Sequence, residues 1–222
     1  MRRLCGLLIP LLLALPGCSG LLHSTAPALQ LYVLQPPPVA SVAAAAEQPA
    51  LPGSAPRLPL PSLRIVRPLT GAGLNTDRIA LLRPGNRLDY YAGSRWSAPL
   101  ADLVSDLQLT AFRVDSAWSA VADDRSTFNA DYLLQTSIDR FTAEYASEAA
   151  PPMIHVELHG LLIRRSDGIL IGSFAVNEQG LAKENRMASV IATFSAVADQ
   201  ALAAVQAQSD QLLRSAKFPA TP

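Results

Sequence analysis

The stretch at residues 84–107 constrains the fold most, because it joins a turn, a strand and a helix with no linker between them. Residues 84–86 (Pro-Gly-Asn) are typical of a tight turn, since proline fixes φ while glycine and asparagine accept positive φ. Residues 87–91 follow as a short strand, with Leu88 and Tyr90 on one face. The chain must therefore leave a sheet and enter a helix within one compact unit.

A helix completes this unit. Residues 92–94 predict a second turn, and Ser97 is expected to cap the helix by accepting a hydrogen bond from its first free N–H groups. Pro99 is tolerated in the first turn, where no intrahelical N–H bond is needed. The apolar residues recur at the spacing of one helical face: Leu100, Leu103, Val104 and Leu107. The helix is predicted to end near Arg113.

Alternating apolar residues predict further strands. The segments are residues 31–35, 62–67, 78–83, 117–122 and 131–141. The first carries Tyr32 and is expected to pair into the main sheet, and Pro68 ends the second. In the last, Tyr132, Leu134 and Ile138 share one parity and are expected on one face.

The clearest hairpin lies between residues 153 and 179. Its turn is predicted at residues 166–168 (Ser-Asp-Gly). On the first strand, the residues expected on one face are Ile154, Val156, Leu158 and Leu162. On the returning strand, the expected set is Ile169, Ile171, Ser173 and Ala175.

Residues 184–208 predict a long amphipathic helix. Its buried face is expected to hold Met187, Val190, Ile191, Phe194, Val197, Leu202 and Val205. Asp199 is the only charge within residues 188–209, so the outer face hints at a second packing partner. The alternative is that alanine simply favours helix and tolerates water. If a partner packs there, glutamate at Ala196 or Ala203 is expected to disturb assembly without unfolding the domain.

The composition is that of a folded, neutral protein. Of 222 residues, 50% are hydrophobic, enough for a substantial core, and only 16% are charged, which argues against a disordered or nucleic-acid-binding protein. Lys plus Arg and Asp plus Glu number 18 each.

The order of elements predicts a single α+β (α/β-like) domain in which two main helices cover one face of a mixed sheet. A free sheet face or edge would remain for oligomerisation or docking.

The N-terminus has the layout of an export signal. Basic residues at positions 2–3 precede an apolar run over residues 4–15, which is too short to span a bilayer, since spanning needs about 20 apolar residues. Residues 1–17 therefore predict a cleaved signal peptide. Cys5 and Cys18 are the only cysteines, so the folded part offers no thiol for a disulfide, a zinc–thiolate cluster or a nucleophile.

Residues 15–18 (Leu-Pro-Gly-Cys) resemble a bacterial lipobox, which would make Cys18 the lipidated residue. Pro16 departs from the pattern, which usually has a small residue there, and an ordinary signal peptide with an incidental cysteine is the alternative. Three acyl chains would anchor the protein far more firmly than one. Ser19, where retention signals carry Asp, resembles the pattern of lipoproteins sent to the outer membrane.

The remaining organisation follows from composition. Residues 18–30 predict a tether, and residues 36–61, with eight prolines, predict a semi-rigid or disordered loop that either contacts a partner or is slack. The main domain is expected over residues 62–208, with a C-terminal tail over residues 209–222.

No residue pattern predicts catalysis or a metal. His155 and His159 lie in a predicted strand, where they would share a face with Glu157 yet sit about 13 Å apart, too far to ligate one zinc ion together. Residues 70–76 hold two glycines but lack a phosphate-loop pattern, so they predict a turn. The following carboxylates are spaced like solvated surface groups: Asp102, Asp106, Asp115, Asp123 and Asp124. No cofactor is expected.

Tyr90, Tyr91 and Trp96 are candidates for contact with a partner protein or a lipid, since tyrosine and tryptophan combine an apolar body with a polar edge. The structural alternative is a clamp that packs the first helix onto the sheet. The clamp role suits Tyr90 and Trp96 better. Tyr91, on the opposite face of the strand, is the better surface candidate.

Tyr90-Tyr91, Arg95-Trp96 and Pro99-Leu100 together resemble the signature of the auxiliary lipoproteins that accompany MCE-type ABC lipid transporters. The resemblance extends more loosely from Leu31 to the C-terminal helix. It implies a non-enzymatic subunit anchored in the outer membrane and facing the periplasm. The implied partners are an MCE-domain protein, an ABC permease and its ATPase. A possible homo-oligomer is expected from the free sheet face or edge, and the composition argues against a nucleic-acid partner. A general envelope scaffold lipoprotein and a secreted hydrolase are the alternatives.

Overall fold

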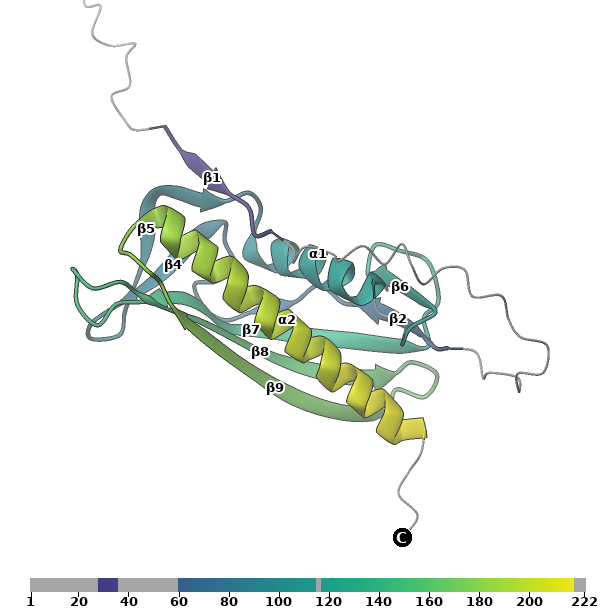
Figure 1. Cartoon of the computed structure of the whole chain (residues 1–222). Helices are drawn as coiled ribbons and strands as arrows, with labels where there is room; N and C mark the ends of the chain where they lie inside the picture. The colour runs from purple at the N-terminus through teal and green to yellow at the C-terminus, as the bar shows by residue number, and fades with distance from the viewer. Residues whose placement is uncertain (1–27, 36–59, 115–116, 218–222) are drawn as a thin grey trace, which may run out of the picture.

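The computed structural model describes residues 28–35, 60–114 and 117–217, which form one mixed sheet with two helices on one of its faces (Figure 1). The predicted single α+β domain is confirmed. The predicted signal peptide, Cys18, Asp115 and residues 36–59 lie outside the described residues. The strands are β1 (Gln30–Tyr32), β2 (Ser62–Ile65), β3 (Leu69–Thr70), β4 (Arg78–Arg83), β5 (Arg87–Trp96), β6 (Ala120–Asp123), β7 (Tyr132–Glu144), β8 (Met153–Arg164) and β9 (Leu170–Leu181).

Strand β7 is the central strand of the sheet, because both of its edges are paired along most of its length. β8 runs antiparallel along one edge, and β9 then pairs with β8. Along the other edge β2, β3 and β4 pair with β7 in succession, all parallel to it. β6 lies beyond β2, while β5 and then β1 lie beyond β4. Among the described strands, the sheet therefore ends at β1 and β6 on one side of β7 and at β9 on the other.

An irregularity in β7 changes which side chains face the helices. Leu134 and Ile138 are buried in its first half, but Phe141 and Ala143 are buried in its second half. The register shifts between Ile138 and Arg140, so Asp139 is an extra residue with no register position opposite it on β8. A bulge of this kind inverts the alternation, which keeps both halves of the long strand facing the same core.

Helix α1 (Leu100–Arg113) has the predicted extent and apolar face. The prediction that Ser97 caps it is wrong, because the N-cap is Pro99 and no side chain caps the helix. The Leu100 N–H donates instead to the Thr76 carbonyl (3.0 Å), and the Ser97 N–H donates to the Tyr32 carbonyl (2.8 Å). Backbone contacts from neighbouring segments thus satisfy this end of the helix.

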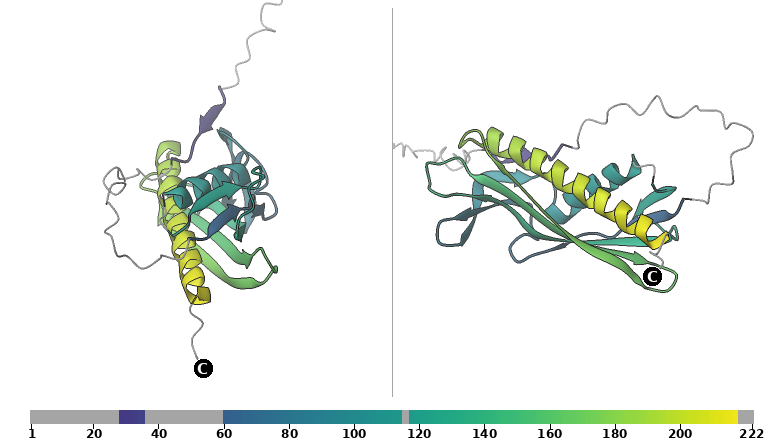
Figure 2. Two further views of the ribbon diagram at one scale, coloured as in Figure 1. Left: turned by 90° about the vertical axis from the view of Figure 1, so that its right-hand side faces the viewer. Right: turned by 60° about the horizontal axis from the view of Figure 1, so that its bottom comes forward.

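Helix α2 (Met187–Lys217) runs diagonally across β8 and β9 (Figure 2). Its predicted buried face is confirmed, but it continues past the predicted end at Gln208. Leu213 is buried, and Gly172 on β9 leaves room for the side chain of Leu212, so the last turns pack onto the sheet. By length and composition alone α2 could cross a membrane, but here it forms part of the core.

Two local predictions fail because strand pairing overrides turn and alternation signals. Residues 92–94 form no turn but continue β5, with Gly93 at φ 65° inside an irregular pairing with β4. On β9, Ser173 and Ala175 are exposed, whereas Phe174 and Val176 are buried. Phe174 pairs with Gly160, whose missing side chain leaves room for the ring.

An aromatic cluster joins the layers at the centre of the core. The Trp96 ring of β5 meets Phe141 of β7 edge-on at 6.0 Å between centroids and Phe194 of α2 at 5.4 Å. Phe141 and Phe194 stack at 5.2 Å. Edge-to-face and offset contacts of this kind stabilise beyond the apolar area that they bury.

We predict that Trp96→Ala lowers the free energy of unfolding by about 3–5 kcal/mol, because it opens a large cavity between sheet and helix. Denaturant unfolding of the variant measures this loss. Trp96→Phe, which keeps an aromatic ring at the site, should lose less. A loss for Trp96→Ala below about 1 kcal/mol would contradict the clamp role.

Hydrogen bonds between Ser62 and Asp131 join the start of β2 to the start of β7. Asp131 Oδ2 accepts hydrogen bonds from the Ser62 N–H (2.8 Å) and hydroxyl (2.6 Å), and the Asp131 N–H donates to Ser62 Oγ (3.0 Å). The hydrogen bond from the Ser62 hydroxyl, followed by that from its N–H, lowers the pKa of Asp131. The folded protein thus favours the ionised carboxylate.

This lowered pKa predicts a pH dependence of stability. The contribution of Asp131 is present above its unfolded pKa of about 3.9 and is lost as the pH falls through the lower folded pKa. Asp131→Asn should therefore destabilise the protein at pH 7, and the difference from the native protein should shrink below pH 4. Unfolding curves across pH measure this, and Ser62→Ala should cost little once Asp131 is already replaced. A difference that stays constant with pH would contradict the assignment.

Candidate partner-binding surface

The structure separates the three candidate aromatic residues. Trp96 is only 2% exposed, so its ring is a core clamp with no surface to offer a partner. Tyr90 is half-buried: its hydroxyl donates to the Gly73 carbonyl (3.0 Å), and the Arg78 guanidinium lies 3.7 Å from the centre of its ring. Tyr90 therefore fastens the loop before β4 to β5.

Tyr91 points to the other side of β5 and belongs to a chain of hydrogen bonds. Its hydroxyl lies 2.9 Å from that of Tyr145, which in turn donates to Asn185 Oδ1 (2.9 Å). Because the Tyr145 proton goes to Asn185, Tyr91 must be the donor in the first bond. Burial, followed by the hydrogen bond to Tyr145, raises the pKa of Tyr91 well above its ordinary value. Tyr91 is thus a neutral donor at physiological pH.

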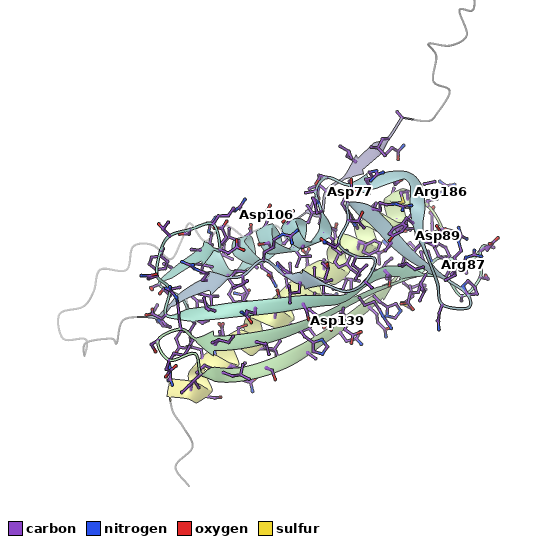
Figure 3. The ribbon with its side chains drawn as sticks, turned by 180° about the vertical axis from the view of Figure 1, so that it is seen from behind. Asp77, Arg87, Asp89, Asp106, Asp139 and Arg186 are labelled. Carbon is purple, nitrogen blue, oxygen red and sulfur yellow. The ribbon has the colours of Figure 1, made fainter. Side chains whose placement is uncertain are left out.

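These groups line a hollow of about 410 Å³, which we call the Tyr91 hollow. Its wall comprises Leu81, Arg83, Asp89, Tyr90, Tyr91, Ala92, Tyr145, Glu148 and Asn185. Four segments meet there: β4, β5, the β7–β8 connection and the β9–α2 connection. Figure 3 shows Asp89 and Arg87 at this end of the molecule, close to the end from which β1 projects.

Opposite charges balance one another along the rim of the Tyr91 hollow. Arg83 Nε lies 3.2 Å from Asp89, and its Nη1 lies 3.4 Å from Glu148, whose side chain is 80% exposed. Asn185 Nδ2 donates to the Glu148 carbonyl (3.0 Å), which ties the β7–β8 connection to the start of α2. The hollow thus combines phenol rings with exposed charges, a composition suited to binding a protein surface.

The two histidines lie on β8, as predicted, and face away from the helices. Each has its own carboxylate on β7: His155 Nε2 lies 3.5 Å from Glu144, and His159 contacts Asp139. In the described part of the chain, no three His, Cys, Asp or Glu side chains gather to hold a metal ion. The histidines are parts of separate surface pairs.

The candidate carboxylates of α1 and β6 form ion pairs rather than a reactive site. Arg125 lies 2.7 Å from Asp123 and 3.7 Å from Asp106, while Arg67 pairs with Asp102. The hydrogen bond from Arg125 lowers the pKa of Asp123. This arrangement leaves Asp102, Asp106 and Asp123 as surface charges with partners.

Sequence reasoning missed both residues that share the hydrogen-bond chain of Tyr91. Tyr145 stands just after β7 and Asn185 just before α2, and they meet Tyr91 only because the sheet brings these ends together. An aromatic residue after a predicted strand signals Tyr145 weakly. No sequence pattern signals Asn185.

Solved structures share this fold. Protein XCC0632 from Xanthomonas campestris superposes with a TM-score of 0.66 at 22% identity, covering 73% of this chain and 92% of its own. A second solved structure, of an uncharacterised protein, gives a TM-score of 0.60 at 10% identity, with 82% and 99% covered. No curated protein matches by sequence. The family model described as the ABC-type transport auxiliary lipoprotein component matches residues 32–206, and the chain belongs to that family.

Proposed function

We propose that this protein is a non-enzymatic subunit of an MCE-type ABC lipid transport system, with phospholipid as the transported class. A lipid on Cys18 anchors it in the outer membrane, and the folded domain faces the periplasm. Its partners are the MCE-domain protein, the permease and the ATPase of the same system. The ATPase supplies the energy, and this chain stabilises the lipid-conducting assembly at the outer membrane.

Family membership is the observation that carries this proposal, because the match runs from β1 into α2 and so covers nearly all of the folded domain. The lipobox supports the anchor. Ala28 lies ten positions after Cys18, so the start of the described domain stays within about 35 Å of the lipidated cysteine.

The Tyr91 hollow is the surface that we assign to the MCE-domain partner. β1 pairs with β5 at Ser94, Arg95 and Trp96, and Tyr91 lies three residues earlier on the same strand. The hollow is therefore close to the point where the anchored chain joins the domain. The tyrosine rings and the exposed Glu148 offer a partner both apolar and polar contacts.

The first test is affinity capture of the full-length, lipidated protein from envelope membranes, with Cys18→Ala in parallel. We expect the native protein to retain an MCE-domain protein and the variant to lose it together with membrane attachment. Absence of an MCE-domain protein in mild detergent would refute the proposal. Recovery of cell-wall assembly factors would favour the scaffold alternative, and hydrolysis of ester or glycosidic substrates would favour the hydrolase.

A second test addresses the hollow. Glu148→Lys reverses an exposed charge at its rim and should lower capture of the MCE-domain protein about tenfold, while the melting temperature stays nearly unchanged. Asp167→Lys is the matched control, because Asp167 pairs with Arg164 at the opposite end of the molecule and should leave capture intact. If Glu148→Lys and Asp167→Lys changed capture equally, the hollow would not be part of the interface with the MCE-domain protein.

A further inference from the structure

An apolar groove lies beside the last strand of the sheet. It measures about 680 Å³ and runs between the end of β9 and the first half of α2. Gly180 and Leu181 form one wall, and the other includes Ala188, Ala192 and Ala196. Lys183, Glu184 and Arg186, from the connection between β9 and α2, also line it. Within the described residues β9 pairs only with β8, so backbone N–H and C=O groups along its outer edge lack a strand partner.

The opposite edge of the sheet carries an apolar stripe. Leu29, Leu31 and Val33, at alternate positions in and around β1, are 55%, 62% and 58% exposed. β1 pairs only with β5 among the described strands, and it projects from the body of the domain (Figure 1). Three large apolar side chains on one exposed face are costly to leave in water and indicate a contact surface.

The stripe and the groove match in length and in spacing. Alternate residues of a strand recur about every 6.6 Å, so the stripe spans about 13 Å. Residues four apart on a helix recur about every 6 Å, so the three alanines of the groove span about 12 Å. This spacing lets each large side chain of the stripe face one small residue of the helix. Residues 28–35 and the three alanines carry no charge. The charged residues that also line the groove, Lys183, Glu184 and Arg186, all precede the alanines in the chain, and Arg186 pairs with Glu184 (3.4 Å).

We propose that the groove between β9 and α2 receives the Leu29–Leu31–Val33 stripe of a second copy of this chain. The contact is head-to-tail, because the two surfaces lie at opposite edges of one sheet and cannot meet within one copy. It covers the open edge of β9 in one copy and the stripe of the next, so each copy can bind two neighbours. This proposal does not depend on the MCE-domain partner.

Ala196 and Ala203 are both expected on the outer face of the helix from the sequence, but only one of them lines the groove. Ala196 lines the groove, whereas Ala203 is exposed on the same helix outside it. In the full-length protein in mild detergent, Ala196→Glu should reduce the mass measured by light scattering to that of one protomer. Ala203→Glu should leave the native multimer intact, and both variants should keep the native melting temperature. A native protein that is already a single protomer, or equal dissociation by both variants, would overturn the proposal.

Mixing experiments test the head-to-tail arrangement itself. Leu31→Lys damages only the stripe and Ala196→Glu only the groove, so each variant alone should be a single protomer. A mixture retains one intact junction, in which the stripe of the Ala196→Glu copy meets the groove of the Leu31→Lys copy. We expect the mixture to give a species of about two protomers and nothing larger. A mixture that stays at one protomer would overturn the arrangement.

The same variants detect a membrane role for the stripe. Leu31→Lys and the native protein can be compared for retention on phosphatidylethanolamine–phosphatidylglycerol vesicles and for mass. A change of mass without a change of vesicle retention is expected. Weaker vesicle binding at unchanged mass would mean that the stripe contacts lipid, and it would refute the contact between copies.

Discussion

The packing of Trp96 against Phe141 and Phe194 is the contact on which the domain depends, because it joins β5, β7 and α2 at one point. β5 carries β1 at its far edge, so the segment nearest the predicted anchor is connected to the core through the strand that ends at Trp96. The cluster also fixes which way β5 faces. With Trp96 turned inward, Tyr91 is left to form the wall of the hollow.

The sequence predicts the elements of this fold well where periodicity is strong. The face of α2 defined by Val190, Phe194 and Val197 follows from helical spacing alone, and so do the extent and face of α1. Predictions based on short local signals fail where tertiary contacts intervene. The Thr76 carbonyl meets the start of α1 and makes a cap by Ser97 unnecessary, and Gly93 continues β5 where a turn is the local expectation.

The candidate site could be predicted only in part. Parity on a single strand is enough to separate Tyr91 from Tyr90, because it depends on two neighbouring residues. The hydrogen bonds from Tyr91 to Tyr145 and on to Asn185 depend on three segments meeting in space, which no local pattern encodes. The groove beside β9 could not be predicted from the sequence either. Alanines on α2 are visible in the sequence, but the open strand edge beside them is a property of the sheet.

Two surfaces of this domain differ in the kind of contact that they offer. The Tyr91 hollow is ringed by Arg83, Asp89 and Glu148, so its contacts are sensitive to charge and to salt. The alanine wall of the groove and the stripe are apolar, so their contact would be governed by buried area. Self-association and partner docking can therefore be tested separately through ionic strength.

The parallel pairing of β2, β3 and β4 with β7 has a consequence for the order in which the domain forms. Ser62 begins β2, Asp131 directly precedes β7, and the two are 69 residues apart, whereas β7 pairs with β8 and β8 pairs with β9. Local pairing closes faster than distant pairing, and a chain is made from its N-terminus. The N-terminal strands thus emerge before the strand that pairs with them exists. Until β7 follows, Leu63 and Ile65 lack the core that buries them, and this half of the chain is the one most exposed to aggregation.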